Sequence, residues 1–210
     1  DVRNYRPLTK SLSSGQVLHC PYNYAKTQLV VKEMTNLLIL DLVAKGLVTN
    51  QITLTIGYDK ESLRNPKLRE KYQEEVTVDY YGRLIPKHAH GTANLGRYTA
   101  SVKNVVEAVM VLFGRIVNPQ FLVRKINLSA NNLQPAGNFI QQQEEIDLFA
   151  EEKLQSSEQA TINGKKEEKL QQAVVELQQK YGKNSVLKGM NLEEGATAMD
   201  RNRQIGGHKA

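Results

Sequence analysis

The carboxylates that could support catalysis are scattered along this sequence. Two-metal phosphoryl transfer needs two or three carboxylates that converge on ions about 4 Å apart. Here Asp59 begins a charged loop, Glu74 and Glu75 lie at the entrance of a candidate strand, and Asp79 is alone on that strand. We interpret these acids as solvated surface groups. The sequence therefore predicts a chain that performs no catalysis of its own.

Metal and thiol chemistry have as little support. His88 and His90 could share one side of an extended segment, but two ligands without a nearby cysteine or carboxylate do not complete a zinc site. Cys20 follows His19, and in a strand these two side chains point to opposite faces, so no base is placed to activate the thiol. The sequence has neither a Walker-type phosphate loop nor a dinucleotide-binding glycine pattern. We predict no metal and no cofactor in this chain.

Positive charge is concentrated in the first part of the chain. Residues 1–132 contain 18 Lys and Arg against 10 Asp and Glu, a balance of +8, whereas residues 133–210 contain 10 against 12, a balance of −2. A basic globular region is typical of phosphate binding, in which neutralised phosphates release their counterions. A basic protein with solubilising lysines and no anionic partner is the alternative.

The cysteine content and the hydropathy bear on location. Cys20 is the single cysteine and cannot form an internal disulfide, which is typical of a reducing compartment, so we expect a cytoplasmic protein. No apolar run reaches the ~20 residues that span a bilayer, and we expect no membrane partner. The first residue is Asp rather than Met, and no leader pattern follows, from which we expect a fragment or a processed chain.

Hydrophobic periodicity predicts an α+β fold for residues 1–132. Helical spacing runs from Asn23, a candidate N-cap, to Gly46, and again over residues 102–116 before Asn118 and Pro119. Strand-like segments flank these helices. In chain order they are residues 16–19, 52–56, 76–80, 92–99 and 121–130. This order favours a mainly antiparallel four-stranded sheet with two amphipathic helices on one face.

The composition changes after residue 132. Residues 133–144 are rich in Asn, Gln, Gly and Pro and predict a linker. In the tail, residues 150–210, helical period returns over about 165–181 with a narrow apolar stripe that needs a partner surface. Residues 182–210 hold five of the fourteen glycines and no long periodic run, so we expect mobility there.

Three segments in the basic region follow a pattern known from one family. Lys10-Ser11-Leu12-Ser13-Ser14-Gly15 precedes the first long helix, residues 90–100 form a Thr-containing basic segment before the second, and Val123-Arg124-Lys125-Ile126 lies on the last strand. Their order resembles the little-finger domain of Y-family lesion-bypass DNA polymerases of the UmuC/DinB class. The run from Lys180 to Ala210 resembles the tail of Gram-positive UmuC-like UV-damage repair proteins.

The resemblance implies a non-catalytic DNA-binding part of an error-prone translesion polymerase that acts in DNA repair and the SOS response. In that family the sheet lies along the major groove and holds backbone phosphates, which carry no base sequence. Magnesium belongs to the palm domain of the parent enzyme. The positions that match the family's DNA contacts are Lys10, Ser11, Ser13, Ser14, Arg97, Thr99, Arg124 and Lys125. Asn127 and Ser129 stand where relatives often have basic residues or glycine, which predicts a weaker contact there.

A second segment resembles the peptide that binds the sliding clamp, whose common form is Gln-Leu-Asp/Ser-Leu-Phe. It is Glu145-Ile146-Asp147-Leu148-Phe149, directly after the predicted linker. Burying Leu148 and Phe149 would yield roughly 3 to 6 kcal/mol before the cost of ordering the segment. Glu145 replaces the usual Gln, which weakens the polar end of the contact. In the alternative, Leu148 and Phe149 dock the tail onto the chain's own domain.

A different class of function also fits the sequence. In this alternative the chain is an α+β protein-interaction scaffold, Arg97 and Arg124 are ordinary exposed side chains, and the helix at about 165–181 binds a partner protein. Retention on heparin or DNA after deletion of residues 133–210 would favour the polymerase module.

Overall fold

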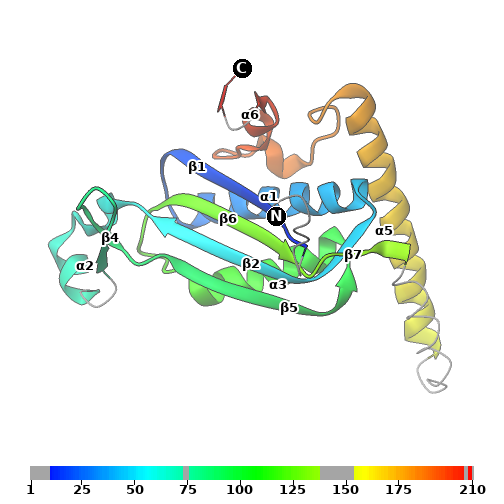
Figure 1. The fold of residues 1–210 in the computed structure, drawn as a ribbon, viewed down its shortest axis with the longest axis horizontal. Coiled ribbons are helices and arrows are strands. Elements are labelled where there is room, and N and C mark those ends of the chain that lie inside the picture. Colours follow the sequence, from blue (N-terminus) through cyan, green and yellow to red (C-terminus); the bar gives the residue numbers. More distant parts are fainter. Residues whose placement is uncertain (1–9, 73–75, 138–153, 206–207, 210) are drawn as a thin grey trace, which may run out of the picture.

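An antiparallel sheet forms the centre of the protein. The computed structural model describes residues 10–72, 76–137, 154–205 and 208–209. The main strands, in spatial order, are β1 (Leu12–Tyr22), β6 (Val123–Asn131), β2 (Leu47–Tyr58) and β5 (Ala89–Thr99). A short strand, β7 (Gln134–Pro135), pairs with the start of β2 (Figure 1). The predicted α+β fold is confirmed, and β7 brings the first residues of the predicted linker into the sheet.

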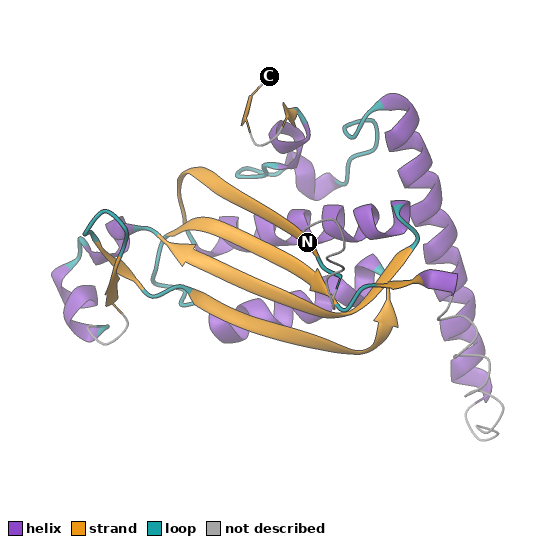
Figure 2. Cartoon of the chain, viewed as in Figure 1, coloured by secondary structure: helices purple, strands orange, loops and turns teal. Residues whose placement is uncertain are grey.

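Two helices cover one face of this sheet. They are α1 (Tyr24–Ala44) and α3 (Val102–Ile116), and both lie behind the sheet in the view of Figure 2. The Asn23 side chain accepts a hydrogen bond from the Lys26 amide at 3.0 Å, and the Ser101 side chain caps α3 in the same way. These caps satisfy amide groups that have no partner within their helices. The sequence signals for both helices are thus confirmed.

The core lies between the helices and the inward side chains of the strands. Every second residue of β2 points inward, because side chains alternate across a strand. The largest fully buried side chains are Phe113, Phe121, Leu18, Met34, Leu38, Ile39, Leu42, Ile52, Leu54, Ile56, Leu112 and Ile126. Each contributes about 1.5–3 kcal/mol of burial free energy. This packing fixes which face of each strand points away from the helices.

The connection between β2 and β5 projects beyond one end of the sheet (Figure 1). It contains η2 (Lys60–Leu63), α2 (Pro66–Lys71) and a hairpin of β3 (Val76–Val78) and β4 (Leu84–Pro86). The predicted strand at 76–80 therefore does not join the main sheet. It ends at Val78 because the Asp79 carboxylate accepts hydrogen bonds from the Tyr81 and Arg83 amides and turns the chain.

The C-terminal part folds back onto the helical layer. Helix α5 (Leu154–Tyr181) starts before the predicted residue 165 and ends as predicted at Gly182, whose φ of 94° favours glycine. It is followed by η4 (Gly189–Leu192), α6 (Ala198–Asn202), β8 (Gln204–Ile205) and β9 (His208–Lys209). We name residues 182–205 the C-terminal strap. Tertiary contacts with α1 and β1 hold this strap, although the sequence has no long periodic run there.

A buried carboxylate of α1 makes the main contact with the C-terminal strap. Glu33 is 1% exposed, and its Oε2 accepts hydrogen bonds from the amides of Thr197 at 2.8 Å and Ala198 at 3.2 Å. Its Oε1 accepts one from Asn191 Nδ2 at 2.7 Å. A buried charge is tolerated only when it is hydrogen-bonded in this manner. The strap therefore completes the polar environment of Glu33.

Helix α5 is attached through a carboxylate of its own, which accepts hydrogen bonds from the start of α3. Glu167 of α5 accepts hydrogen bonds from Ser101 Oγ at 2.8 Å and from the Lys103 amide at 3.0 Å. These groups lie at the start of α3, where a carboxylate is favoured by the helix dipole. Two carboxylates thus join the C-terminal region to the rest of the fold: Glu33 of α1 binds the C-terminal strap, and Glu167 of α5 binds the start of α3.

Candidate nucleic-acid interface

The face of the sheet that points away from α1 and α3 is polar. We name it the open face, and among the described residues no helix covers it (Figure 1). Its members are the outward residues of the strands, placed by register and by alternation with buried neighbours. They are Ser13, Gly15 and Val17 on β1, Lys125, Asn127, Ser129 and Asn131 on β6, Gln51, Thr53, Thr55 and Gly57 on β2, and His90, Thr92 and Asn94 on β5.

A row of hydroxyl and amide groups runs across all four strands of the open face. Ser13 and Ser129 share a hydrogen bond of 2.8 Å, and Ser129 Oγ donates to Asn131 Oδ1 at 3.2 Å. Asn131 Nδ2 donates to Thr53 Oγ1 at 2.9 Å, and the hydroxyls of Thr53 and Thr92 are 3.2 Å apart. Because each group orients the next, the row presents fixed uncharged donors and acceptors.

Two glycines leave positions on the open face without side chains. Gly15 is paired with Asn127, and a Cβ at Gly15 would lie 2.6 Å from Asn127 Oδ1. Gly57 is paired with Lys125, and a Cβ there would lie 3.1 Å from Lys125 Cβ. The side chains of Asn127 and Lys125 therefore lie close to bare backbone on the neighbouring strands. This arrangement leaves room for a broad partner to approach the sheet.

The predicted DNA-binding residues on β1 and β6 have different surroundings. Ser13 and Lys125 are on the open face and exposed. Ser14 points the other way and accepts a hydrogen bond from the Arg201 guanidinium of the C-terminal strap. Arg124 lies at an irregularity of β6, where its Nε is 4.0 Å from Asp59 Oδ2. Of the residues predicted on these two strands, Ser13 and Lys125 thus belong to the open face.

The remaining predicted residues are at the ends of edge strands. Ser11 and Lys10 are exposed at the entry to β1, where the Lys10 carbonyl accepts a hydrogen bond from the Leu133 amide at 3.0 Å. Arg97 is exposed and follows Gly96, whose φ is 72°, in an irregular part of β5. Thr99 Oγ1 accepts a hydrogen bond from the Ser101 amide at 3.0 Å and so stabilises the turn into α3.

The register shows which predicted cations lie together. Arg124 and Lys125 are neighbours at one end of the sheet, next to the end of β2. Lys10 and Arg97 lie at the other end, on the opposite edge strands β1 and β5. The four cations therefore do not form one cluster.

Sequence reasoning missed most of the open face. Thr53, Asn131 and Gln51 carry no charge and lie outside the segments that resemble the family, and Thr92 is an uncharged residue within one of these segments. One signal was available: the threonines of residues 52–56 alternate with buried aliphatic residues, which assigns them to the face away from the core. This alternation could have identified the β2 contribution.

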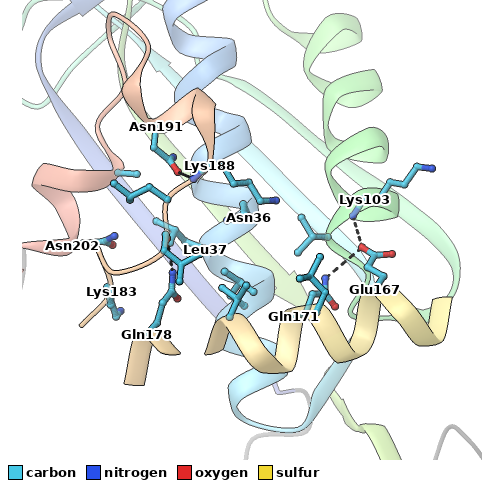
Figure 3. Close-up of a pocket in the computed structure, with 17 residues that line it drawn as sticks. Asn36, Leu37, Lys103, Glu167, Gln171, Gln178, Lys183, Lys188, Asn191 and Asn202 are labelled. Carbon is cyan, nitrogen blue, oxygen red and sulfur yellow. Dashed lines mark hydrogen bonds between the residues drawn. The ribbon is translucent and has the colours of Figure 1, made fainter. Parts of the chain in front are cut away.

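A groove lies between α1, α5 and the C-terminal strap (Figure 3). Its volume is about 290 Å³, and its walls are mainly apolar side chains such as Leu37, Leu40 and Val102. Burial lowers the pKa of the Lys188 amine at its margin. Within the described ranges, no three or more His, Cys, Asp or Glu side chains come close enough to hold a metal ion. We assign no chemistry to this groove.

Comparison with known proteins decides the family. A search of curated proteins found no match. A family model described as the impB/mucB/samB family C-terminal domain matches residues 9–145, more than half of the chain. The chain belongs to this family. Its matched region is the little-finger domain of Y-family DNA polymerases, and the fold agrees with that assignment.

The little-finger match covers the whole main sheet and both helices that support it. It ends before α5 and the C-terminal strap, so these elements are attached outside the matched region. The predicted clamp-binding residues Glu145, Ile146, Asp147, Leu148 and Phe149 lie outside the described residues. No helix in the part of the chain that the structure describes is long and apolar enough to cross a membrane.

Proposed function

We propose that the open face binds the sugar-phosphate backbone of duplex DNA as the template-binding part of an error-prone translesion polymerase. The observation that supports this most strongly is the row from Ser13 to Thr92, because its hydroxyl and amide groups suit phosphate oxygens. Such contacts read no base sequence. They suit an enzyme that must tolerate damaged templates.

The mechanism relies on fixed neutral groups more than on charge. Lys125 supplies one cation on the open face, and Arg124 beside it is partly neutralised by Asp59. Ser129 contributes a hydroxyl that is already oriented by Ser13 and Asn131. A pre-ordered row loses little conformational entropy when it binds. Affinity therefore depends on the shape of the backbone as well as on counterion release.

Charge changes on the two sides of the molecule test this proposal. Lys125→Glu and Ser129→Asp place negative charge on the open face, and each should weaken binding of a blunt duplex at least tenfold in fluorescence anisotropy. Arg115→Glu is the matched control, because Arg115 is exposed in the last turn of α3 on the other side of the sheet. Equal losses for Lys125→Glu and Arg115→Glu would show only a dependence on net charge and would contradict the proposed surface.

We also propose that residues 145–149 recruit the protein to a sliding clamp, with support from the sequence pattern alone. The double variant Leu148→Ala, Phe149→Ala should lose micromolar binding to a purified bacterial clamp in surface plasmon resonance, while its affinity for duplex DNA stays unchanged. Retained clamp binding would refute this part of the proposal.

The proposal further includes the biological setting. The chain would act in DNA repair during the SOS response, in the cytoplasm, and synthesis would be performed by the palm of the parent enzyme. A primer-extension assay on this chain with magnesium and nucleotides should give no product. Extension by the purified chain would overturn this view.

One observation favours the second candidate, a protein-interaction scaffold. Helix α5 leaves apolar side chains in solvent, with Leu170 65% and Tyr181 63% exposed. Deleting residues 133–210 does not separate the two functions, since it also removes β7 and the partners of Glu33. Leu170→Glu instead alters the exposed stripe and the adjoining rim of the groove, and it leaves β7 and the partners of Glu33 in place. Unchanged DNA binding in this variant, together with loss of a protein partner, would assign a scaffold role to α5 alone.

A further inference from the structure

The β3–β4 hairpin exposes two adjacent tyrosines that the duplex-binding proposal does not use. Tyr80 is 97% exposed and Tyr81 75% exposed at its tip. The hairpin lies beyond the end of the sheet, beside α2 (Figure 1). Large aromatic side chains in full contact with water mark interaction sites when they are held in place.

The turn that carries these tyrosines is firmly built. Asp79 Oδ1 accepts hydrogen bonds from the Tyr81 and Arg83 amides, both at 2.9 Å. Asp79 Oδ2 forms an ion pair with Arg83 Nη2 at 2.6 Å, and Gly82 adopts a φ of 74° that favours glycine. The backbone of the tip is thus ordered before any partner arrives. A pre-ordered site pays less entropy on binding.

The geometry of the rings suits stacking on a planar partner. The two tyrosine rings meet edge to face, with centroids 5.4 Å apart and planes at 87°. The Arg83 guanidinium lies 4.9 Å from the centroid of Tyr81 and covers one of its faces. Tyr80 is left as a nearly fully exposed ring. Base–aromatic stacking is the common way in which such rings contact unpaired nucleotides.

Charge favours an anionic partner for the hairpin, and its position beside the open face favours nucleic acid. Residues 76–90 contain one acid, Asp79, which is paired with Arg83. They also contain Lys87, His88 and His90. The base of the hairpin packs on η2, at the end of the sheet where Lys125 lies. The tip therefore projects from the end of the open face, where a strand that leaves the duplex would pass.

We propose that Tyr80 stacks on an unpaired base of single-stranded DNA adjoining the duplex held by the open face, and that Tyr81, which meets Tyr80 edge to face, holds its ring in position. This inference extends the proposed function to a separate contact. One stacked base contributes about 1–3 kcal/mol, which corresponds to roughly 5- to 150-fold in affinity. The hairpin would favour substrates with a single-stranded overhang over blunt duplexes.

The test compares blunt duplex, overhang duplex and single-stranded DNA for the full chain and three variants. Tyr80→Ala, Tyr81→Ala should lower affinity for the overhang duplex and the single strand at least fivefold and leave the blunt duplex unchanged. Tyr80→Phe, Tyr81→Phe should retain the affinity, because phenyl rings also stack. Tyr181→Ala, an exposed tyrosine of α5, is the matched control. A 2-aminopurine in the overhang reports stacking through fluorescence quenching that the alanine variant should lose.

Two results would overturn the inference. One is an unchanged affinity and unchanged quenching in the alanine variant. The other is an equal loss on blunt and overhang duplexes, which would assign the tyrosines to general binding. Failure of the open-face proposal would give a different result: the affinity of Lys125→Glu for blunt duplex would equal that of the wild type. Thermal unfolding of each variant shows whether the exposed substitutions leave the fold intact.

Discussion

Replacing Glu33 should release the C-terminal strap from the helical layer. The carboxylate receives four hydrogen bonds: from Asn191 Nδ2 at 2.7 Å, from the amides of Thr197 and Ala198 at 2.8 and 3.2 Å, and from Thr197 Oγ1 at 3.4 Å. Bonds to a charged group contribute about 1.5–3 kcal/mol, and each donor left buried without a partner costs about 1–3 kcal/mol. Since these terms are not additive, we expect Glu33→Ala to destabilise the docked strap by about 3–5 kcal/mol.

Hydrogen exchange measured by mass spectrometry tests this directly. Since 1.4 kcal/mol is a factor of ten, peptides that contain residues 191–198 should exchange at least a hundredfold faster in Glu33→Ala. Glu33→Gln keeps the size of the side chain and one acceptor oxygen, and its effect should be intermediate. Glu194→Ala is the control, because the Lys26–Glu194 ion pair of 2.6 Å is on the surface of the same strap and exposed. Such pairs contribute little.

Two outcomes would refute this reasoning. Wild-type exchange in Glu33→Ala would mean that other contacts hold the C-terminal strap, such as that between Arg201 and Ser14. An equally large effect of Glu194→Ala would mean that surface charge, rather than the buried carboxylate, determines docking.

Three further predictions follow from single contacts. Gly91→Ala, on β5, should lower the unfolding free energy by about 1–3 kcal/mol in urea titration, because its Cβ would lie 2.8 Å from a methyl group of Leu112 on α3. Gly114→Ala, on α3, should instead raise the unfolding free energy by about 0.5–1 kcal/mol, because its Cβ would have only one distant neighbour. The hydrogen bond from Arg83 lowers the pKa of Asp79, so the hairpin turn should be fully stabilised above the ordinary carboxylate pKa of about 4 and lose that stabilisation as the pH falls through the lowered value. Amide chemical shifts of residues 79–83 would show this, and a transition at or above the ordinary carboxylate pKa would contradict it. The log–log salt slope for a blunt duplex should be about −1 to −2, because Lys125 is the cation on the open face and Arg124, its neighbour on β6, is partly neutralised by Asp59; a slope steeper than about −4 would mean that additional cations make the contact.

Local physics made the helices and the face of each strand predictable. Asn23 and Ser101 are typical N-caps at the start of apolar helical stripes, and both caps are present. The alternation within residues 52–56 correctly gives a strand with one buried face. The segment at 76–80 has the same alternation but belongs to a separate hairpin. Strand order and partner choice depend on contacts distant in sequence, which periodicity does not encode.

The candidate site was harder to predict for a related reason. Ser13 and Ser14 are equivalent in the sequence, but the register of β1 on β6 places Ser13 on the open face and Ser14 next to Arg201. Glu33 would be expected on the surface of an amphipathic helix. It is buried because the C-terminal strap covers it, and its hydrogen-bond partners in that strap lie 158 to 165 residues later in the chain. Helical periodicity does not reveal such a distant contact. The sequence indicates cations as the DNA contacts, whereas the fold brings together uncharged side chains on the open face.

Contact between DNA and the open face can be mapped residue by residue through amide chemical shifts. A blunt duplex titrated into isotope-labelled protein should shift the amide resonances of Thr53, Ser129 and Lys125, and those of α1 and α5 should stay in place. Shifts confined to the helical layer or to α5, with β2 and β6 unaffected, would contradict the account.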